Sequence, residues 1–274
     1  MRRLFDTLLI AALAIAVVFL FLPILALFLR ISPSSLVSAL TSDVALDALW
    51  VTVKTGLIAH AFVLGLGTPA AYLLATRRFR GRDVIITIFE LPLVLPPAVA
   101  GIGLLAAFGR RGLLGDQLSA LGISIPFTQV AVVMAVAFVA APFYLRQAIA
   151  AFAAVDRSLF DASRTLGASP WRTFRRIALP LSAGGLGAGS TLAWARGTGE
   201  FGATIMFAGS FQGVTQTMPL AIYAELDQDV DVAIAIGALL VVLSAAVLLS
   251  VKLVPSWRPS TSVLPTPFAP SSST

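Results

Sequence analysis

The sequence predicts an all-α integral membrane protein with about six transmembrane helices. Hydrophobic residues make up 58% of the 274 positions, and the mean hydropathy is +0.95. Charged residues make up only 12%, whereas about 25% is typical of soluble domains. Long apolar stretches recur along the chain and alternate with short segments that hold most of the arginines. This pattern indicates repeated crossings of a bilayer.

Six apolar segments reach the length of about 20 residues that a helix needs to cross the hydrocarbon core. They are residues 8–29, 49–76, 84–108, 126–148, 183–208 and 230–252. The first follows Arg2 and Arg3, as the core of a signal peptide would. It is longer than such a core and no small-residue cleavage site follows it, so we read it as a retained helix. Several prolines in or near these segments predict kinked helices.

The distribution of basic residues predicts the orientation of the spans. With the N-terminus in the cytoplasm, 14 of the 19 Lys and Arg residues fall in cytoplasmic segments and three in outer loops. The positive-inside rule therefore favours cytoplasmic N- and C-termini. We assign residues 1–254 to a transmembrane domain. Residues 255–274, rich in Pro, Ser and Thr, are expected to form a disordered cytoplasmic tail.

Several kinds of chemistry lack the residues they would need. The chain has no cysteine and only one histidine, His60, so we expect no metal site. It has no G-x-x-x-x-G-K-[ST] phosphate loop, no H-E-x-x-H and no G-x-S-x-G. We therefore predict no catalytic residue and expect that the protein is not an enzyme.

The loop between the fourth and fifth spans, residues 149–182, carries its own helix caps. Asp156 is a good N-cap for a helix that begins at Arg157, and Gly167 is placed to end that helix in a left-handed conformation. Ser169 then caps a second helix with Pro170 at its first position. We expect this second helix to reach about Ala178 and to be closed by Leu179-Pro180.

One face of the first loop helix is expected to be apolar. Leu159, Ala162 and Leu166 recur at helical spacing. Ala162 and Ser163 are small, so a partner surface can approach closely there. The alternative is a basic loop that only satisfies the topology, but such a loop needs neither paired caps nor a small-residue surface.

These residues resemble the cytoplasmic loop of ABC-importer permeases, whose motif reads Glu-Ala-Ala, three residues, Gly, nine residues, Ile-x-Leu-Pro. Asp161, Ala162 and Ser163 stand for Glu-Ala-Ala, with two mild departures. The remaining motif positions match in identity and spacing. The resemblance implies a type I importer-like fold whose coupling helix docks on an ATPase subunit. The implied docking residues are Asp161, Ala162, Ser163, Leu166, Gly167, Ile177, Leu179 and Pro180.

Further segments resemble the molybdate-transporter permease and its sulfate and tungstate relatives. They are Leu91–Pro97 with Gly109–Gly112, then Gly199–Thr204, then Gln216–Tyr223. The resemblance implies a homodimer in a bacterial or archaeal cell (inner) membrane. It also implies two ATPase subunits that bind ATP and Mg²⁺, and an external oxyanion-binding protein. The permease itself is expected to bind no cofactor and no nucleic acid.

The fifth span holds the candidate pathway residues Arg196, Glu200 and Thr204. Arg196 and Glu200 are four residues apart and can pair on one helix face. Such a pair can lock the fifth helix against its neighbours, or it can form a gate or an anion contact. Gly185 and Gly189 in the same span have a spacing that allows backbones to approach closely.

We therefore predict the permease subunit of an ATP-driven importer of an oxyanion, with molybdate as the expected substrate. Tungstate and sulfate remain open, because these anions share charge and shape. Two other classes also remain open. One is a secondary transporter driven by an ion gradient, with Glu90, Arg196 and Glu200 as coupling groups. The other is a membrane scaffold that transports nothing.

Overall fold

A computed structural model of the chain describes residues 2–253, and the predicted tail at 255–274 lies outside the described residues. The described part is helical and contains no strand. Its helices are α1 (Arg2–Arg30), α2 (Pro33–Leu40), α3 (Asp43–Thr76), α4 (Arg82–Val94), α5 (Pro97–Phe108), α6 (Gly115–Ala120), α7 (Gln129–Ala153), α8 (Arg157–Thr165), α9 (Pro170–Thr173), α10 (Leu179–Thr198), α11 (Gly202–Ala208), α12 (Met218–Glu225) and α13 (Val230–Leu253). A π-helical segment, Phe174–Ala178, joins α9 to α10.

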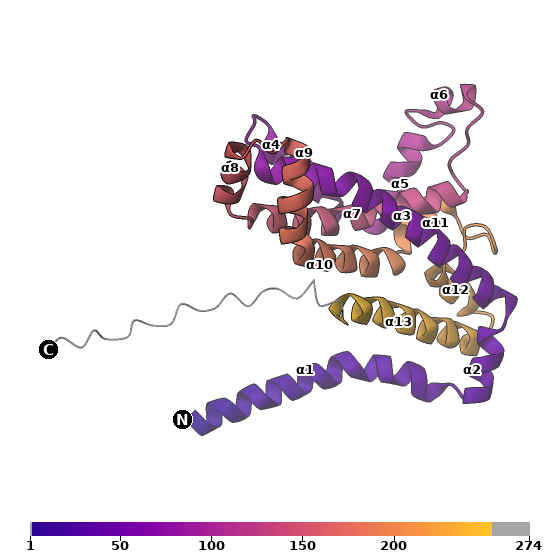
Figure 1. Cartoon of the computed structure of the whole chain (residues 1–274). Helices are drawn as coiled ribbons and strands as arrows, with labels where there is room; N and C mark the ends of the chain where they lie inside the picture. Colours follow the sequence, from indigo (N-terminus) through magenta and orange to yellow (C-terminus); the bar gives the residue numbers. More distant parts are fainter. Residues whose placement is uncertain (1, 254–274) are drawn as a thin grey trace.

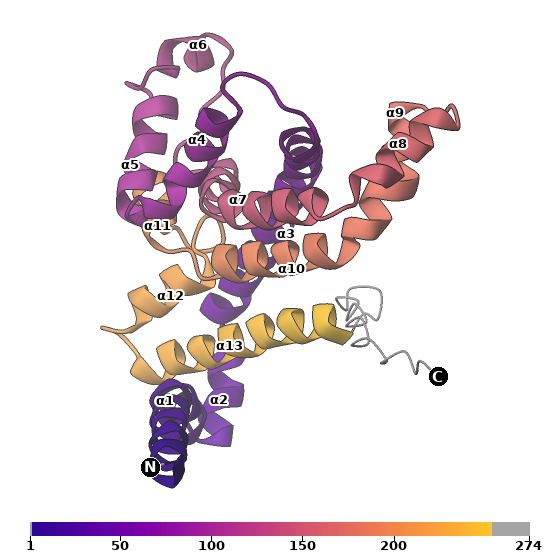
Figure 2. The same cartoon turned by 90° about the vertical axis from the view of Figure 1, so that its left-hand side faces the viewer.

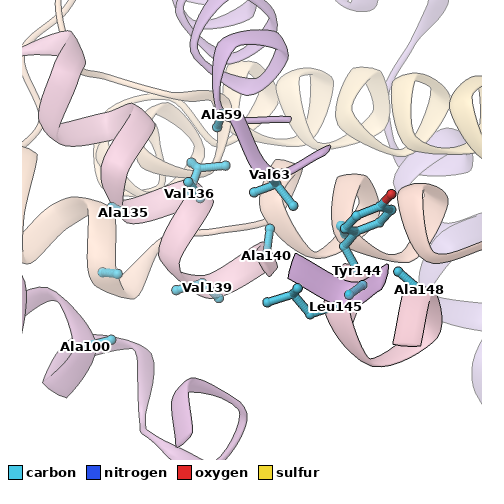
Figure 3. Packing of buried hydrophobic residues seen from close by; sticks show 14 of the residues in the cluster. Ala59, Val63, Ala100, Ala135, Val136, Val139, Ala140, Tyr144, Leu145 and Ala148 are labelled. Carbon is cyan, nitrogen blue, oxygen red and sulfur yellow. The ribbon is translucent and has the colours of Figure 1, made fainter. Parts of the chain in front are cut away.

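Helix α7 forms the centre of the molecule, with α3 and α10 packed along it and α11, α4 and α5 around its other side (Figures 1 and 2). Its buried positions are mostly alanine and valine, and the side chains of Ala135, Val139 and Ala140 lie in the main core (Figure 3). Tyr144, only 2% exposed, closes this core toward α3, where its hydroxyl lies 2.6 Å from that of Thr68.

The contact between α10 and α7 depends on small residues. A Cβ atom on Gly189 would lie 2.8 Å from Cβ of Gln147, and one on Gly185 would overlap Cβ of Ala151. These glycines let the two backbones approach closely, as their spacing predicts. The packing interpretation of this glycine pair is therefore confirmed.

The N-terminal helix α1 lies apart from this centre and runs beside α13 (Figure 1). Its apolar span, Leu4–Arg30, buries none of its residues within the described part of the chain. Side chains such as Phe19 (75% exposed) and Leu29 (74%) therefore face outward. Such a surface suits contact with lipid, which is as apolar as the side chains themselves.

In the described part of the chain, four helical spans are long and apolar enough to cross a membrane, and a bent pair of helices could make a fifth. The four are Leu4–Arg30, Asp43–Thr76, Gln129–Ala153 and Val230–Ser250. The bent pair is α4 and α5, whose axes turn by 117°. The count of six spans therefore stays a prediction.

The two predicted spans that differ from the structure are interrupted by recognisable residues. Residues 84–108 break where Leu95 and Pro96 are extended, because Pro96 and Pro97 lack N–H groups and disfavour helix before them. Residues 183–208 break between Thr198 and Gly202, so this region contains α10 and the short α11.

Candidate functional site

The helix α8 projects from one end of the helical bundle, beside α9 (Figure 2). Asp156 caps its first turn, because its Oδ1 accepts a hydrogen bond of 2.9 Å from the N–H of Ser158. This bond stabilises the ionised carboxylate and lowers the pKa of Asp156 below its ordinary value. The cap predicted from the sequence is therefore present, and it is fully charged at neutral pH.

The other end of α8 closes in a Schellman motif. Gly167 has φ +73°, and its N–H donates to the carbonyl of Arg164 at 2.9 Å. The N–H of Ala168 donates to the carbonyl of Ser163 at 3.0 Å. These two bonds satisfy carbonyls that the end of a helix would otherwise leave free. The left-handed glycine predicted at position 167 is confirmed.

The outward face of α8 is apolar. Leu166 is 85% exposed, Leu159 is 42% exposed, and Ala162 between them is also exposed. Trp171, at the start of α9, is 66% exposed. Apolar side chains that are exposed together, outside the membrane-spanning helices, mark a candidate surface for binding another protein. We call Leu159, Ala162 and Leu166 the apolar face of α8.

Ser163 points inward, away from this face. It is 5% exposed, its Oγ donates to the carbonyl of Phe160 at 2.9 Å, and it lies 2.9 Å from Oγ1 of Thr173. Of the predicted docking residues, Asp161 and Ala162 on α8 and Leu166 and Gly167 directly after it are exposed, whereas Ser163 links α8 to α9. Its small size serves the contact inside the loop.

Ile177, Leu179 and Pro180 lie at the base of the loop, within one uninterrupted helical path. The expectation that Leu179-Pro180 closes the second loop helix is wrong. The N–H of Leu179 donates to the carbonyl of Phe174, five residues back, so the helix widens just before Pro180. A π-helical turn admits a proline without ending the helix. The path therefore runs from Pro170 to Thr198.

The far end of this path holds Arg196 and Glu200, which form an ion pair with 2.7 Å between Nη2 and Oε2. The Glu200 side chain is 1% exposed and that of Arg196 is 28% exposed. The other carboxylate oxygen, Oε1, accepts the N–H of Ala203 at 2.7 Å and so caps α11. Glu200 thus joins the end of α10 to the start of α11, both within the predicted fifth span. The role of the pair as a gate or an anion contact stays a prediction.

Thr204, the third candidate of the pathway, is completely buried in α11, and its hydroxyl finds no hydrogen-bond partner among the described residues. Three further side chains with buried oxygens that lack such a partner are Ser210, Gln216 and Thr217, in the loop before α12. We predicted no separate role for these residues from the sequence. The feature of the sequence that could have revealed them is a run of polar residues in a glycine-containing loop between apolar helices.

Other ionisable side chains have local roles. His60 lies 2.8 Å from the Ser190 hydroxyl and packs edge-on against Trp194. Lys54 donates to Gln129 at 2.8 Å. In the described part of the chain no group of three or more His, Cys, Asp or Glu residues could hold a metal ion.

Comparison with known proteins then identifies relatives. The sequence model of the family described as "Binding-protein-dependent transport system inner membrane component" matches residues 67–257. The molybdenum transport system permease protein ModB of Mycobacterium tuberculosis is 43% identical over 235 residues, which are 86% of this chain and 89% of that protein. A probable transport system permease protein, NifC of Clostridium pasteurianum, is 37% identical over 254 residues, covering 92% and 89%.

Solved structures share the fold. A bacterial ABC transporter involved in the import of alginate has a chain with a TM-score of 0.72 at 17% identity, covering 91% of this chain and 93% of that one. A chain of the MetNI methionine ABC transporter, in an inward-facing conformation, has a TM-score of 0.59 at 20% identity, covering 76% and 93%.

Proposed function

We propose a function for this chain that follows from its family. The chain belongs to the binding-protein-dependent transport system inner membrane components. It is a multi-pass membrane protein of the permease type. We infer that it forms the pathway for molybdate in an ATP-driven importer. The substrate assignment rests on the ModB relatives, with 43% identity over most of both chains.

The observation that carries this proposal is the apolar face of α8. Leu166 is bare at the end of a helix capped at both ends, and the helical path behind it runs into the bundle. An ATPase subunit that binds this face can move α8, and α9 with α10 transmits the movement toward Arg196 and Glu200. ATP and Mg²⁺ are bound by that subunit, and this chain contributes force transmission and no catalysis.

The proposed assembly contains two copies of this chain, two ATPase subunits and an external oxyanion-binding protein. α8 and both chain termini face the cytoplasm. Alternating access then follows from closure of the ATPases, which shifts the pair of permeases between an inward-open and an outward-open state.

Reconstituted transport tests the proposal. The chain is placed in liposomes with its ATPase and its binding protein, and uptake of radiolabelled molybdate is measured with ATP, with a non-hydrolysable analogue, and with an ionophore. We expect uptake that requires hydrolysable ATP and persists when the ion gradient is collapsed.

Two results would change the assignment. Uptake that depends on the ion gradient and needs no ATPase would favour a secondary transporter. Competition by tungstate or sulfate at lower concentration than unlabelled molybdate would move the substrate to that anion.

A further inference from the structure

A cleft of about 370 Å³ opens behind α8, on the side opposite to its apolar face. Its walls come from the last turns of α3 and α7 and from α8 and α9. On α8, Phe160 and Arg164 line the cleft, whereas Leu159 and Leu166 point the other way. The apolar face of α8 therefore lies apart from the cleft, and of the predicted docking residues on this helix only Asp161 also lines it.

Four guanidinium groups gather around the cleft, from two different parts of the chain, the end of α3 and α8. They belong to Arg77, Arg78, Arg157 and Arg164. The one carboxylate of the described lining, Asp161, lies 3.4 Å from Arg164. Arg77, Arg78 and Arg157 form no ion pair with any residue that the structure describes. The cleft thus has an excess of unpaired positive charge.

The floor of the cleft is aromatic. Tyr72 and Phe152 are in edge contact, with ring centroids 5.4 Å apart, and Phe160 lies beside Tyr72 at 6.5 Å. The cleft therefore offers apolar surface at its base and arginines at its rim. A ligand that matches this arrangement has an anionic head and an apolar portion.

The cleft also sits at the edge of a membrane span. Asp43–Thr76 is one of the spans apolar enough to cross a bilayer, and Thr76 and Arg77 at its end line the cleft. Basic residues that directly follow an apolar span are expected close to the membrane surface, where lipid headgroups lie. Arginine suits phosphate because its planar donors bind two oxygens at once.

We propose that this cleft is a binding site for an anionic phospholipid, held by its phosphate headgroup between Arg77 and Arg157. The topology rule accounts for basic residues on one side of the membrane. It does not require that arginines from α8 and from the end of α3 converge on a shared aromatic floor. A lipid bound here would touch both α3 and α8, and so would influence how the proposed docking helix is held.

Native mass spectrometry of the purified full-length chain, titrated with dioctanoyl phosphatidylglycerol, tests this site. Each basic residue near a lipid headgroup raises the affinity for the lipid about fivefold. We therefore expect the double variant Arg77→Gln/Arg157→Gln to bind the lipid about thirtyfold more weakly. The matched control is Arg175→Gln/Arg176→Gln, which removes the same charge from exposed positions of the π-helical segment outside the cleft. The control and Arg77→Lys/Arg157→Lys should keep most of the affinity.

Further arms of the experiment separate the sources of phosphate. Inorganic phosphate and glycerol 3-phosphate, at the lipid's concentration, should not displace it, and dioctanoyl phosphatidylcholine should bind weakly. Displacement by either soluble phosphate would overturn the lipid assignment. So would equal losses in the cleft variant and its control. Unchanged lipid binding with loss of ATPase binding in the cleft variant would assign the cleft to an acidic segment of the ATPase instead.

The elution volume and thermal midpoint of each variant without lipid report whether it is folded. The four arginines are exposed or partly paired at the surface, so their replacement leaves the core intact. Lipid binding is measured on the permease alone, so failure of this site leaves the proposed transport function untouched.

Discussion

Gly167 shows how a single backbone angle supports a proposed docking surface. Its φ of +73° lies in the left-handed region, which costs a residue with a Cβ about 1–2 kcal/mol. No atom lies within 4 Å of the place where its Cβ would be, so the constraint comes from the backbone alone. The turn positions Leu166, which precedes it and is 85% exposed, directly after the last residue of α8.

Gly167→Val is therefore expected to uncouple transport. The strained turn would displace Leu166, and we expect ATP-dependent molybdate uptake to fall about tenfold or more, with weaker capture of the ATPase. Gly167→Asn is the matched control, because asparagine tolerates the left-handed conformation better than other residues with a side chain. Wild-type uptake and ATPase capture by the valine variant would argue against the assigned role of this turn.

Replacing Arg196 alone should cost more stability than replacing both residues of the Arg196–Glu200 ion pair. Arg196→Met leaves the carboxylate of Glu200, 1% exposed, without its countercharge. Since Arg196 is partly exposed, we expect a loss near the lower end of the several kcal/mol known for breaking buried pairs, about 2–3 kcal/mol.

The double variant Arg196→Met/Glu200→Gln should recover part of this loss, because no unpaired charge remains and the glutamine oxygen can still cap α11. Thermal unfolding of the purified variants measures the loss of stability in the single variant and in the double variant. If the two single substitutions prove additive in the double variant, the pair has no coupling of its own.

At the scale of elements, the path from α9 through the π-helical segment into α10 connects the loop to the bundle. It spans residues 170–198 without a break. α8 is attached to this path through Ser163 and Thr173, whose hydroxyl oxygens lie 2.9 Å apart. In the proposed function, a movement of α8 would pass through this contact to α9 and along the continuous helix to α10.

Leu166→Glu should remove the proposed docking contact without unfolding the protein. The side chain is 85% exposed, so a charge there costs little stability, whereas burying that charge in an apolar interface is unfavourable. We expect affinity for the ATPase to fall about tenfold or more by surface plasmon resonance. Ser158→Glu, an exposed position in the first turn of α8, is the control and should bind normally. Equal binding by both variants would exclude this face.

The close approach of α10 and α7 predicts a strong steric effect at Gly189. Gly189→Leu introduces atoms where even a Cβ would lie 2.8 Å from Gln147, so the helices must separate. We expect a loss of about 1–3 kcal/mol in stability, with lower yield of folded protein. Ala188→Leu, on the exposed side of the same helix, should change the midpoint of thermal unfolding little. A midpoint for Gly189→Leu that matches this control would refute the packing argument.

At the scale of the whole molecule, the positions of α6 and α8 predict which introduced cysteines can be labelled from outside the cell. α6 and α8 lie at opposite ends of the bundle (Figure 1). The chain has no cysteine, so single cysteines can be introduced without background. In intact cells, Leu121→Cys after α6 should react with a membrane-impermeant thiol reagent, and Ser158→Cys in α8 should react only after the cells are opened. The reverse pattern would contradict the proposed orientation.

The parts of this fold that the sequence predicts well depend on neighbours in the chain. α8 begins after Asp156 and ends before Gly167 as expected, because caps are formed by residues within a few positions of the helix end. The pairing of Arg196 with Glu200 follows from their spacing of four residues. The apolar face of α8 could likewise be read from helical periodicity.

By itself, the sequence determined a helical membrane protein with a capped polar loop, because hydropathy, charge and capping are properties of short segments. The tertiary structure decided the rest. It decided the 117° turn between α4 and α5, the passage of the helix through Pro180, and the inward position of Ser163. Pro96 and Pro97 set the place where α4 ends, but the angle of the turn and the other two features depend on the side chains that surround each backbone. That information is spread over helices far apart in the chain.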